Sequence, residues 1–271
     1  DSSMTIIAAA HAFQRAEAEL GREELLRRLD YLNLAPDQPL AAQLLDGVYQ
    51  ATANSSAETL RSAKALAEDL GARFHHWDVQ PMVEQYTQQV AQSLGRKLTW
   101  ETDDLALQNI QARARVPALW MLTNTRGALL LATANRSELA VGYTTMDGDT
   151  AGGLAPIAGL AKAEVLSWLR WAETELGISA LRHVNALQPT AELRPAEQGR
   201  QSDEVEMLPF AVLRRIEHLA LVEGRSPREI YAALTAEGPT TPPPAEAVRR
   251  FFRSWARSQW TRERTALSFH L

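Results

Sequence analysis

Four polar side chains with complementary chemistry, Thr133, Glu138, Asp149 and Lys162, lie close together in the sequence. The apolar run 128–131 precedes them and is long enough for one buried strand. In α/β proteins, ligands bind at the carboxyl ends of parallel strands, where the connecting loops begin. A strand that delivers a hydroxyl, two carboxylates and an ammonium group into such loops therefore predicts a ligand site.

The elements that must position these side chains can be expected from the same stretch. Ser137 is a suitable cap for a short helix that would carry Glu138 in its first turn. A polar, glycine-rich loop follows at 144–153, and Lys162 begins a further helix. The sequence thus predicts a strand, a short helix, a long loop and a second helix in that order.

The segment SELAVGYTTMDGDTAGGLAPIAGLAK, residues 137–162, closely resembles the signature region of the NAD synthetase family. Members of that family use ATP to convert deamido-NAD to NAD. Several residue types match in order over about thirty positions, which is more specific than a short motif. The resemblance implies an α/β fold of the adenine nucleotide α-hydrolase type, with a mostly parallel sheet flanked by helices.

The resemblance also implies roles for individual residues. Asp1 and Glu138 match magnesium ligands, and Mg²⁺ commonly takes one or two carboxylates together with phosphates and water. Lys162 would stabilise negative charge, and Asp149 would help to orient ammonia. Both are the expected catalytic residues. The expected ATP-binding residues are Asp1, Ser2, Asn54, Ser55 and Thr133, and the expected deamido-NAD-binding residues are Asn109, Arg113, Asp149 and Lys162.

The implied reaction begins when ATP adenylates the nicotinate carboxylate of deamido-NAD and pyrophosphate leaves. Ammonia then displaces AMP and gives the amide. Such chemistry depends mostly on charge neutralisation and positioning, so it needs no nucleophilic side chain and no histidine base. ATP is a co-substrate and Mg²⁺ the expected cofactor.

The sequence departs from the family pattern at three kinds of position. Ala132 and Ala134 stand where the family often has glycine, and alanine restricts the positive φ values that glycine permits. Asp147 stands where tyrosine is common, and Ala53 precedes Asn54 without the usual basic or threonine residue. None of these changes removes a proposed charged group.

The beginning of the sequence suggests a fragment, because Asp1, Ser2 and Ser3 lead directly into an amphipathic helix. In the family, a strand and a phosphate-binding turn come first. We therefore expect an N-terminally truncated synthetase domain over 1–271, with a helical tail at 236–271 after a Pro-rich spacer. The long insert before Asn54 and the extended tail favour the glutamine-dependent form, whose nitrilase-like glutaminase domain would lie upstream.

Alternatives remain at this point. The chain could be an ammonia-only NAD synthetase, another amide ligase of the ATP pyrophosphatase class, or a non-catalytic nucleotide-binding or scaffold module. In the family, an asparagine and an arginine of a helix at the dimer axis contact the dinucleotide. We therefore expect a homodimer through 108–124, where Asn109 and Arg113 share a face and Arg115 lies roughly opposite.

The remaining elements follow from periodicity and from capping residues. His75 and His76 are neighbours in a strand, so they point to opposite faces and are expected to be structural. Asp203 and Glu204 match an acidic pair in a mobile loop at 196–206, with surface charge and substrate contact both open. Arg262 and Arg264 are candidates for a return of the basic tail to the nucleotide. The expected strands cover 47–51 and 72–79, and the expected helices cover 57–70, 80–94, 103–124 with a kink at Pro117, 162–177, 209–224, 226–238 and 245–264.

The composition narrows the class of protein. A net charge of −5 does not favour a nucleic-acid surface, and the absence of cysteine excludes disulfides and a cysteine nucleophile within this chain. No apolar run approaches the roughly 18 residues that span a membrane. We expect a cytoplasmic enzyme domain.

Overall fold

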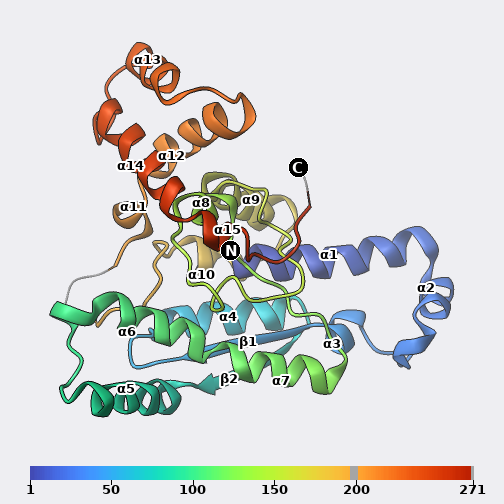
Figure 1. Cartoon of the computed structure of the whole chain (residues 1–271). Coiled ribbons are helices and arrows are strands. Elements are labelled where there is room, and N and C mark those ends of the chain that lie inside the picture. The colour runs from blue at the N-terminus through green and yellow to red at the C-terminus, as the bar shows by residue number, and fades with distance from the viewer. Residues whose placement is uncertain (196–200, 270–271) are drawn as a thin grey trace. The chain divides into compact units, whose positions relative to one another are not determined.

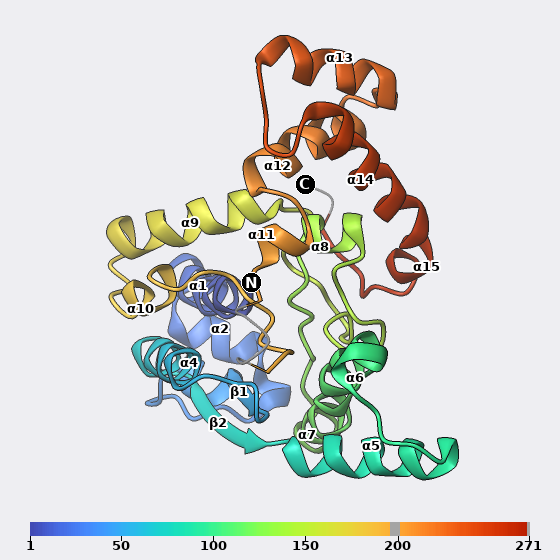
Figure 2. The same cartoon turned by 90° about the vertical axis from the view of Figure 1, so that its left-hand side faces the viewer.

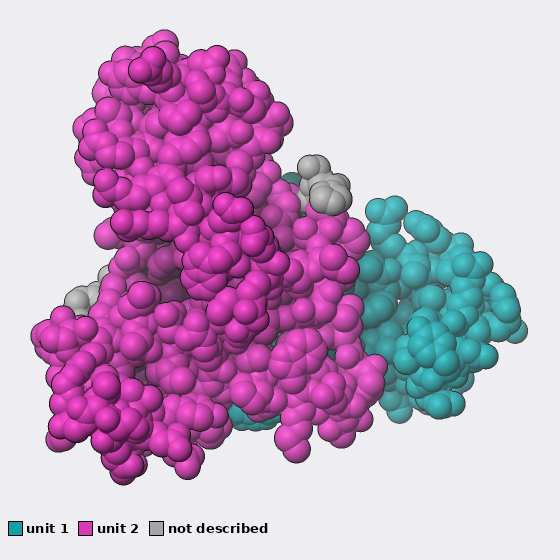
Figure 3. All heavy atoms as spheres, in the orientation of Figure 1, with its two compact units in different colours: residues 1–51, 55–78, 168–187 teal, residues 52–54, 79–167, 188–271 magenta. Residues whose placement is uncertain are grey.

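The computed structural model describes residues 1–195 and 201–269. The chain divides into two compact units, which Figure 3 shows in different colours. Unit 1 comprises residues 1–51, 55–78 and 168–187, and unit 2 comprises residues 52–54, 79–167 and 188–271.

Unit 1 is built on two parallel strands, β1 (Asp46–Ala51) and β2 (Arg73–Asp78), which pair from Asp46 opposite Arg73 to Ala51 opposite Asp78. Parallel strands need a crossover connection, and α4 (Ala57–Asp69) supplies it and packs against both strands (Figure 1). The Ser56 hydroxyl caps α4 by accepting the Thr59 N–H. Both strands and the capped helix are therefore confirmed, and with them the α/β class.

The two neighbouring histidines are explained by packing within this sheet. His75 Nε2 lies 2.8 Å from Asp46 Oδ1, and Arg73 donates to both oxygens of the same carboxylate. The His76 ring instead contacts Tyr49 edge to face. Their opposite orientations and structural roles are as predicted.

Several further helices complete the two units. In unit 1 they are α1 (Ser2–Leu20), α2 (Arg22–Arg28), η1 (Asp30–Leu32), α3 (Leu40–Leu44) and α10 (Leu181–Asn185), and in unit 2 α5 (Gln80–Leu94), α8 (Arg136–Val141), α11 (Asp203–Glu206) and α15 (Gln259–Arg262), while α9 (Lys162–Glu175) begins in unit 2 and ends in unit 1. None of the helices in the described part of the chain combines the length and apolar composition needed to cross a bilayer.

The long helix expected at 103–124 is two helices, α6 (Trp100–Ala114) and α7 (Val116–Arg126). The break falls at Arg115, and Pro117 lies in the first turn of α7, where its missing N–H leaves no hydrogen bond unmade. A second irregularity lies at Asp103, whose φ of −124° departs from helical values. The helical geometry is therefore interrupted near both the expected start, at Asp103, and the expected kink, at Arg115.

The core of unit 2 is helical and lies among α12 (Phe210–Glu217), the π-helical turn η3 (His218–Val222), α13 (Pro227–Glu237) and α14 (Pro244–Arg257). Figure 1 and Figure 2 show these helices together at one end of the unit. The fully buried side chains there include Leu213, Ile216 and Ile230. Ser226 and Glu229 form a capping box at the start of α13, and the helix expected at 226–238 is confirmed.

The buried strand expected at 128–131 is wrong. Leu131 forms only an isolated parallel bridge to Leu154, which in turn bridges to Leu267, and Leu129 is 60% exposed. The Leu130 carbonyl accepts the Gly153 N–H, so this run pairs with the glycine-rich loop rather than with a neighbouring strand. Apolar composition alone does not show whether such a run pairs with a strand or with a loop.

Candidate active site

The site is organised by the first turn of α8. Asn135 is the N-cap, its side chain accepts the Glu138 N–H at 3.0 Å, and Glu138 Oε2 accepts the Asn135 N–H at 3.1 Å. This reciprocal pair fixes the backbone around Glu138. The expected cap, Ser137, lies inside the helix instead, because Asn135 stands three residues before Glu138, as a capping box requires.

Glu138 and Lys162 lie next to each other in the structure. Lys162 Nζ lies 3.1 Å from Glu138 Oε1 and 3.4 Å from Asp203 Oδ2, and the lysine is only 4% exposed. The Ser137 hydroxyl accepts the Lys162 N–H at 3.0 Å, which ties α9 to α8. The result is a buried ammonium group held between two carboxylates.

Asp203 is not a surface charge, so that interpretation of the acidic pair is wrong for this residue. It is 4% exposed, and one carboxylate oxygen, Oδ1, is buried without a hydrogen-bond partner in the described structure. Glu204 is exposed and accepts the Phe210 N–H at 3.0 Å. The expected mobile loop lies partly at 196–200, outside the described residues.

A second buried carboxylate supports α8 from α12. Glu217 is fully buried, and its Oε2 lies 3.4 Å from Arg136 Nε. Burial raises the pKa of the Glu217 carboxyl, against the lowering effects of the Ser137 hydroxyl and the Arg136 charge. Arg136 also donates to the Gly159 carbonyl at 2.8 Å, so it links α12 to the segment before α9.

The loop at 144–149 is folded around Asp149. Its Oδ2 accepts the Thr145 N–H at 2.9 Å. Burial raises the pKa of the Asp149 carboxyl, while the Thr145 N–H and the charges of Arg115 and Arg113 oppose that rise. The charges of both arginines therefore lower the pKa of Asp149. We expected Arg115 to lie opposite Arg113, but Arg115 stands at the end of α6.

Asn109 and Arg113 do share one face of α6, and that face meets the same loop. Thr145 Oγ1 donates to Asn109 Oδ1 at 2.9 Å, and Arg113 Nε donates to the Met146 carbonyl at 3.0 Å. Asp147 has a φ of +59°, a left-handed conformation that aspartate tolerates better than most residues. The departure from the family pattern at this position is thus compatible with the turn.

Asn54 is tied to α6 by a residue that the sequence analysis did not single out. Its amide donates to Gln111 Oε1 and to the Leu193 carbonyl, each at 3.0 Å. Gln111 is buried and donates to the same carbonyl at 2.7 Å. Nothing in the local sequence marks Gln111, because its burial depends on the Leu193 carbonyl, which is distant in the chain.

The turn before α8 contains Thr133, which is half-buried between two buried alanines. Among the described non-glycine residues, positive φ occurs only at Asn33, Asp147 and Glu192. Ala132 and Ala134 therefore adopt ordinary conformations. Gly152 is required nearby, because a Cβ at that position would lie 2.7 Å from the Ala132 backbone nitrogen.

The basic tail meets this region at two places. Arg262 donates to the Ala140 carbonyl at 3.3 Å, and its guanidinium lies 3.7 Å from the centre of the Trp255 ring. Arg264 forms an exposed ion pair of 3.2 Å with Asp147. Arg262 thus caps the end of α8, while Arg264 lies at the glycine-rich loop.

The other expected nucleotide-binding residues belong to unit 1. Asp1 is the N-cap of α1, and Ser2 is exposed in its first turn. Ser55 precedes the cap of α4 and is half-buried. These residues stay predictions for a nucleotide site.

The residues around Glu138 suit a magnesium ion in their chemistry. Glu138 and Asp203 supply hard carboxylate oxygens, and Asp203 Oδ1 is a buried oxygen without a hydrogen-bond partner among the described residues. Within the described chain, no group of three histidine, aspartate or glutamate side chains is placed to hold a metal. One or two carboxylates are sufficient when substrate phosphates and water complete the shell.

Comparison with known proteins decides the family. The NAD synthase family model matches residues 37–263 of the chain. The chain belongs to the NAD synthase family. The glutamine-dependent NAD(+) synthetase of Aquifex aeolicus is 36% identical over 191 residues, which are 70% of this chain and 32% of that protein. The corresponding protein of Thermotoga maritima is 32% identical over 194 residues, or 71% of this chain and 32% of that protein.

Solved structures agree on the fold of this NAD synthase family member. A glutamine-dependent NAD(+) synthetase from Cytophaga hutchinsonii is 43% identical, with a TM-score of 0.86, over 100% of this chain and 45% of that chain. An NH3-dependent NAD synthetase from Campylobacter jejuni, 17% identical with a TM-score of 0.53, covers 81% of this chain and 77% of that chain and shares the fold. The chain spans about a third of the length of the curated relatives it matches.

Proposed function

We propose that this chain forms the synthetase part of a glutamine-dependent NAD synthetase. In the proposed reaction, the nicotinate carboxylate of deamido-NAD attacks ATP, the bond to the adenylyl phosphorus forms, and pyrophosphate leaves. Ammonia then attacks the acyl-adenylate, AMP leaves, and the nitrogen loses a proton to give the amide. The observation that carries the proposal is the buried 3.1 Å pair of Glu138 and Lys162 within the residues that the NAD synthase family model matches.

Lys162 is the proposed electrostatic catalyst. Its ammonium group is buried, and buried donors stabilise developing charge more strongly than solvated ones. When anionic substrate binds, the lysine would exchange part of its contact with Glu138 and Asp203 for phosphate or carboxylate oxygens. The carboxylates would then be available to a cation.

Glu138 and Asp1 are the proposed holders of Mg²⁺. Magnesium, when bound, would neutralise phosphate charge during adenylation. We propose that Ser2, Asn54, Ser55 and Thr133 bind ATP through their hydroxyl and amide groups. Asn54 would have to exchange at least part of its contact with Gln111 to do so.

Asn109, Arg113 and Asp149 are the proposed contacts of deamido-NAD. Their common attachment to the loop at 144–149 supports this assignment, because one ligand could meet all three. Asp149 would orient ammonia next to the activated carboxyl. Its raised pKa, caused by burial, suits a carboxyl that works beside a polar nitrogen rather than as a solvated charge.

We also propose a cytoplasmic homodimer that uses the surface of residues 108–124. Trp120 is 40% exposed and Met121 is 73% exposed on α7. Adjacent exposed apolar side chains of this size are typical of interaction surfaces. The ammonia is proposed to come from glutamine through a glutaminase domain.

The test is Glu138→Gln in the whole protein. The amide oxygen of glutamine can still accept the Asn135 N–H, so the start of α8 should survive. We expect NAD formation from deamido-NAD, ATP and ammonia to fall by about 10²–10³-fold, the size typical for loss of one group that stabilises transition-state charge. Product AMP and pyrophosphate should fall equally.

Two comparisons make this result decisive. Glu246→Gln changes an exposed glutamate of α14 in the same way and should leave turnover unchanged. Wild-type rates should be measured with ammonia and with glutamine, which separates the synthetase step from the nitrogen supply. Normal turnover of Glu138→Gln would remove this residue from the mechanism, and a wild-type protein that consumes no ATP with deamido-NAD and ammonia would refute the proposed function.

A further inference from the structure

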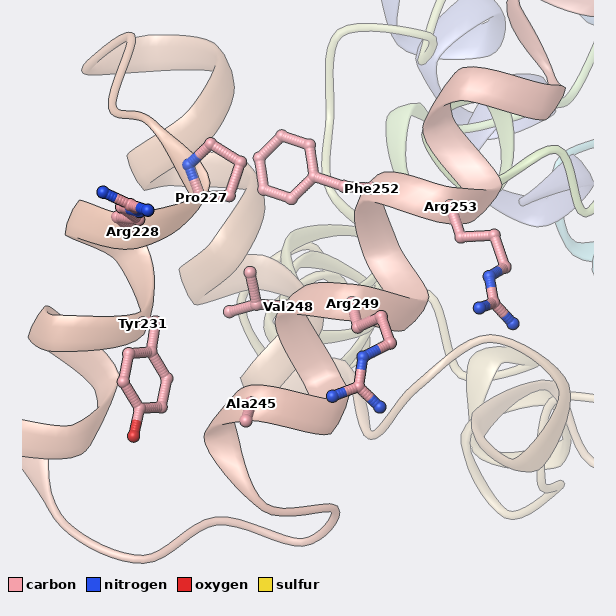
Figure 4. Close-up of a pocket in the computed structure, with 8 residues that line it drawn as sticks. All are labelled: Pro227, Arg228, Tyr231, Ala245, Val248, Arg249, Phe252 and Arg253. Carbon is pink, nitrogen blue, oxygen red and sulfur yellow. The ribbon is translucent and has the colours of Figure 1, made fainter.

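A groove lies between α13 and α14, far along the sequence from the residues proposed for catalysis. It has a volume of about 500 Å³, and the surface that lines it is mostly apolar, although Arg228, Arg249 and Arg253 are among the lining residues (Figure 4). Val248 and Phe252 of α14 face Pro227 and Tyr231 of α13 across it. Tyr231 is 47% exposed, so a large aromatic surface remains open to solvent.

Positive charge lies beside this apolar surface. Arg228 of α13 and Arg249 and Arg253 of α14 also line the groove, and all three are exposed. No ion pair joins any of them to a residue that the structure describes. Arginines of adjoining segments differ, since Arg215 pairs with Glu237 and Arg225 pairs with Glu223.

The spacing of these charges opposes helix stability. Arg249, Arg253 and Arg257 follow one another at intervals of four along α14, where like charges repel. The helix has four arginines and a single glutamate, Glu246, in a chain whose net charge is −5. A local excess of unpaired positive charge in a negatively charged chain is suited to an acidic ligand.

The shape of the groove distinguishes a polypeptide from a small molecule. Sites for small ligands are concave and bury most of the ligand surface. This groove is open along two helices, which is the geometry into which an amphipathic helix places its apolar face. We propose that the groove binds an acidic amphipathic helix of another polypeptide, with apolar residues on Val248, Phe252 and Tyr231 and acidic residues against the arginines.

The probe is a fluorescent peptide of about 18 residues, long enough to form an isolated helix. Its leucines follow the i, i+3, i+4, i+7 pattern, and glutamates flank them among alanines. Binding to the purified full chain is measured by anisotropy. Two altered peptides serve for comparison, one with glutamine for every glutamate and one with serine for every leucine.

We expect each altered peptide to bind at least about tenfold more weakly than the parent. The double variant Arg249→Glu/Arg253→Glu should weaken binding of the parent peptide about tenfold, since each exposed pair contributes only a modest energy. Arg170→Glu, an exposed arginine of α9, is the matched control and should change binding less than twofold. NAD formation by the whole protein should not change in either variant.

Three outcomes would overturn the proposal. The first is equal binding of the parent and serine peptides, which would show charge attraction without use of the groove. The second is equal binding to the double variant and the wild-type chain. The third is concentration-dependent self-association that the double variant abolishes, because a second copy of the chain would then be the occupant.

Discussion

Unit 2 contains two clusters of charged side chains, which differ in burial and in ion pairing. At the starts of α8 and α9, Lys162 is buried between Glu138 and Asp203. Beside α13 and α14, Arg249 and Arg253 are exposed and have no ion-pair partner in the described structure. The first cluster is internally neutralised, whereas the second leaves its charge available.

The difference follows from the cost of desolvation. An unpaired buried charge costs several kcal/mol, so the charge of Lys162 must be matched within the folded chain. An exposed arginine is hydrated and screened, so it can remain unmatched at a cost of tenths of a kcal/mol. We therefore expect substitutions in the two clusters to change stability by different amounts and in opposite directions.

The largest effect is expected for Lys162→Met, which removes the charge but keeps an apolar stem of similar length. Glu138 and Asp203 would be left buried without their cation, which typically costs about 3–5 kcal/mol. Urea unfolding at neutral pH measures this loss.

The control for that variant is Lys64→Met in α4. Lys64 pairs with Glu68 at 3.8 Å, and its side chain is 59% exposed. Exposed pairs of this kind contribute about 0–1 kcal/mol. If both lysine variants lost the same stability, the contrast between matched burial and exposure would be wrong.

Several elements of the fold could be predicted from local sequence. Ser56 and Ser226 caps, the proline at 117, and the strands around β1 and β2 all depend on residues close in the chain. A shared ligand site for Glu138 and Lys162 was also expected, but their direct ion pair was not. Local capping rules failed at α8, where the sequence pointed to Ser137 and the N-cap is Asn135.

The missed features depend on partners that are distant in the sequence. Asp203 looks like a surface acid until Lys162 is placed beside it, and Gln111 looks like part of a solvated helix until the Leu193 carbonyl meets it. The run at 128–131 was apolar enough for a strand, but its neighbour is a glycine-rich loop. Such contacts are set by tertiary structure, which overrides local propensity.

Glu217→Gln tests a second buried carboxylate of unit 2, which pairs with Arg136 of α8. Burial raises the pKa of the Glu217 carboxyl, so its protonated form favours the folded state and its ionised form opposes folding. The contribution of Glu217 to the free energy of unfolding is fully present below the pKa that its carboxyl has in the unfolded chain. It is lost as pH rises through the pKa of the carboxyl in the folded chain. The stability of Glu217→Gln relative to wild type should therefore increase with pH.

Glu229→Gln is the control with the opposite sign. The Ser226 hydroxyl and backbone N–H lower the pKa of the Glu229 carboxyl, so its contribution exists above the unfolded pKa and is lost in acid. This variant should be less stable than wild type at neutral pH and equal to it at low pH. Parallel pH profiles for the two variants would contradict the assignment of Glu217.

The smallest change in stability is expected for Arg253→Gln in the groove. This substitution should stabilise the fold, whereas Lys162→Met should destabilise it. Arg253 lies four residues from both Arg249 and Arg257, so its neutralisation removes two repulsive pairs, each of about 0.2–0.5 kcal/mol. The variant should unfold at slightly higher urea concentration than wild type in low salt, and the gain should disappear near 1 M salt, where the screening length is about 3 Å. Arg170→Gln lacks such neighbours and should show no gain. A loss of stability in Arg253→Gln would mean that this arginine is already satisfied within the chain and that its charge is not available to a partner.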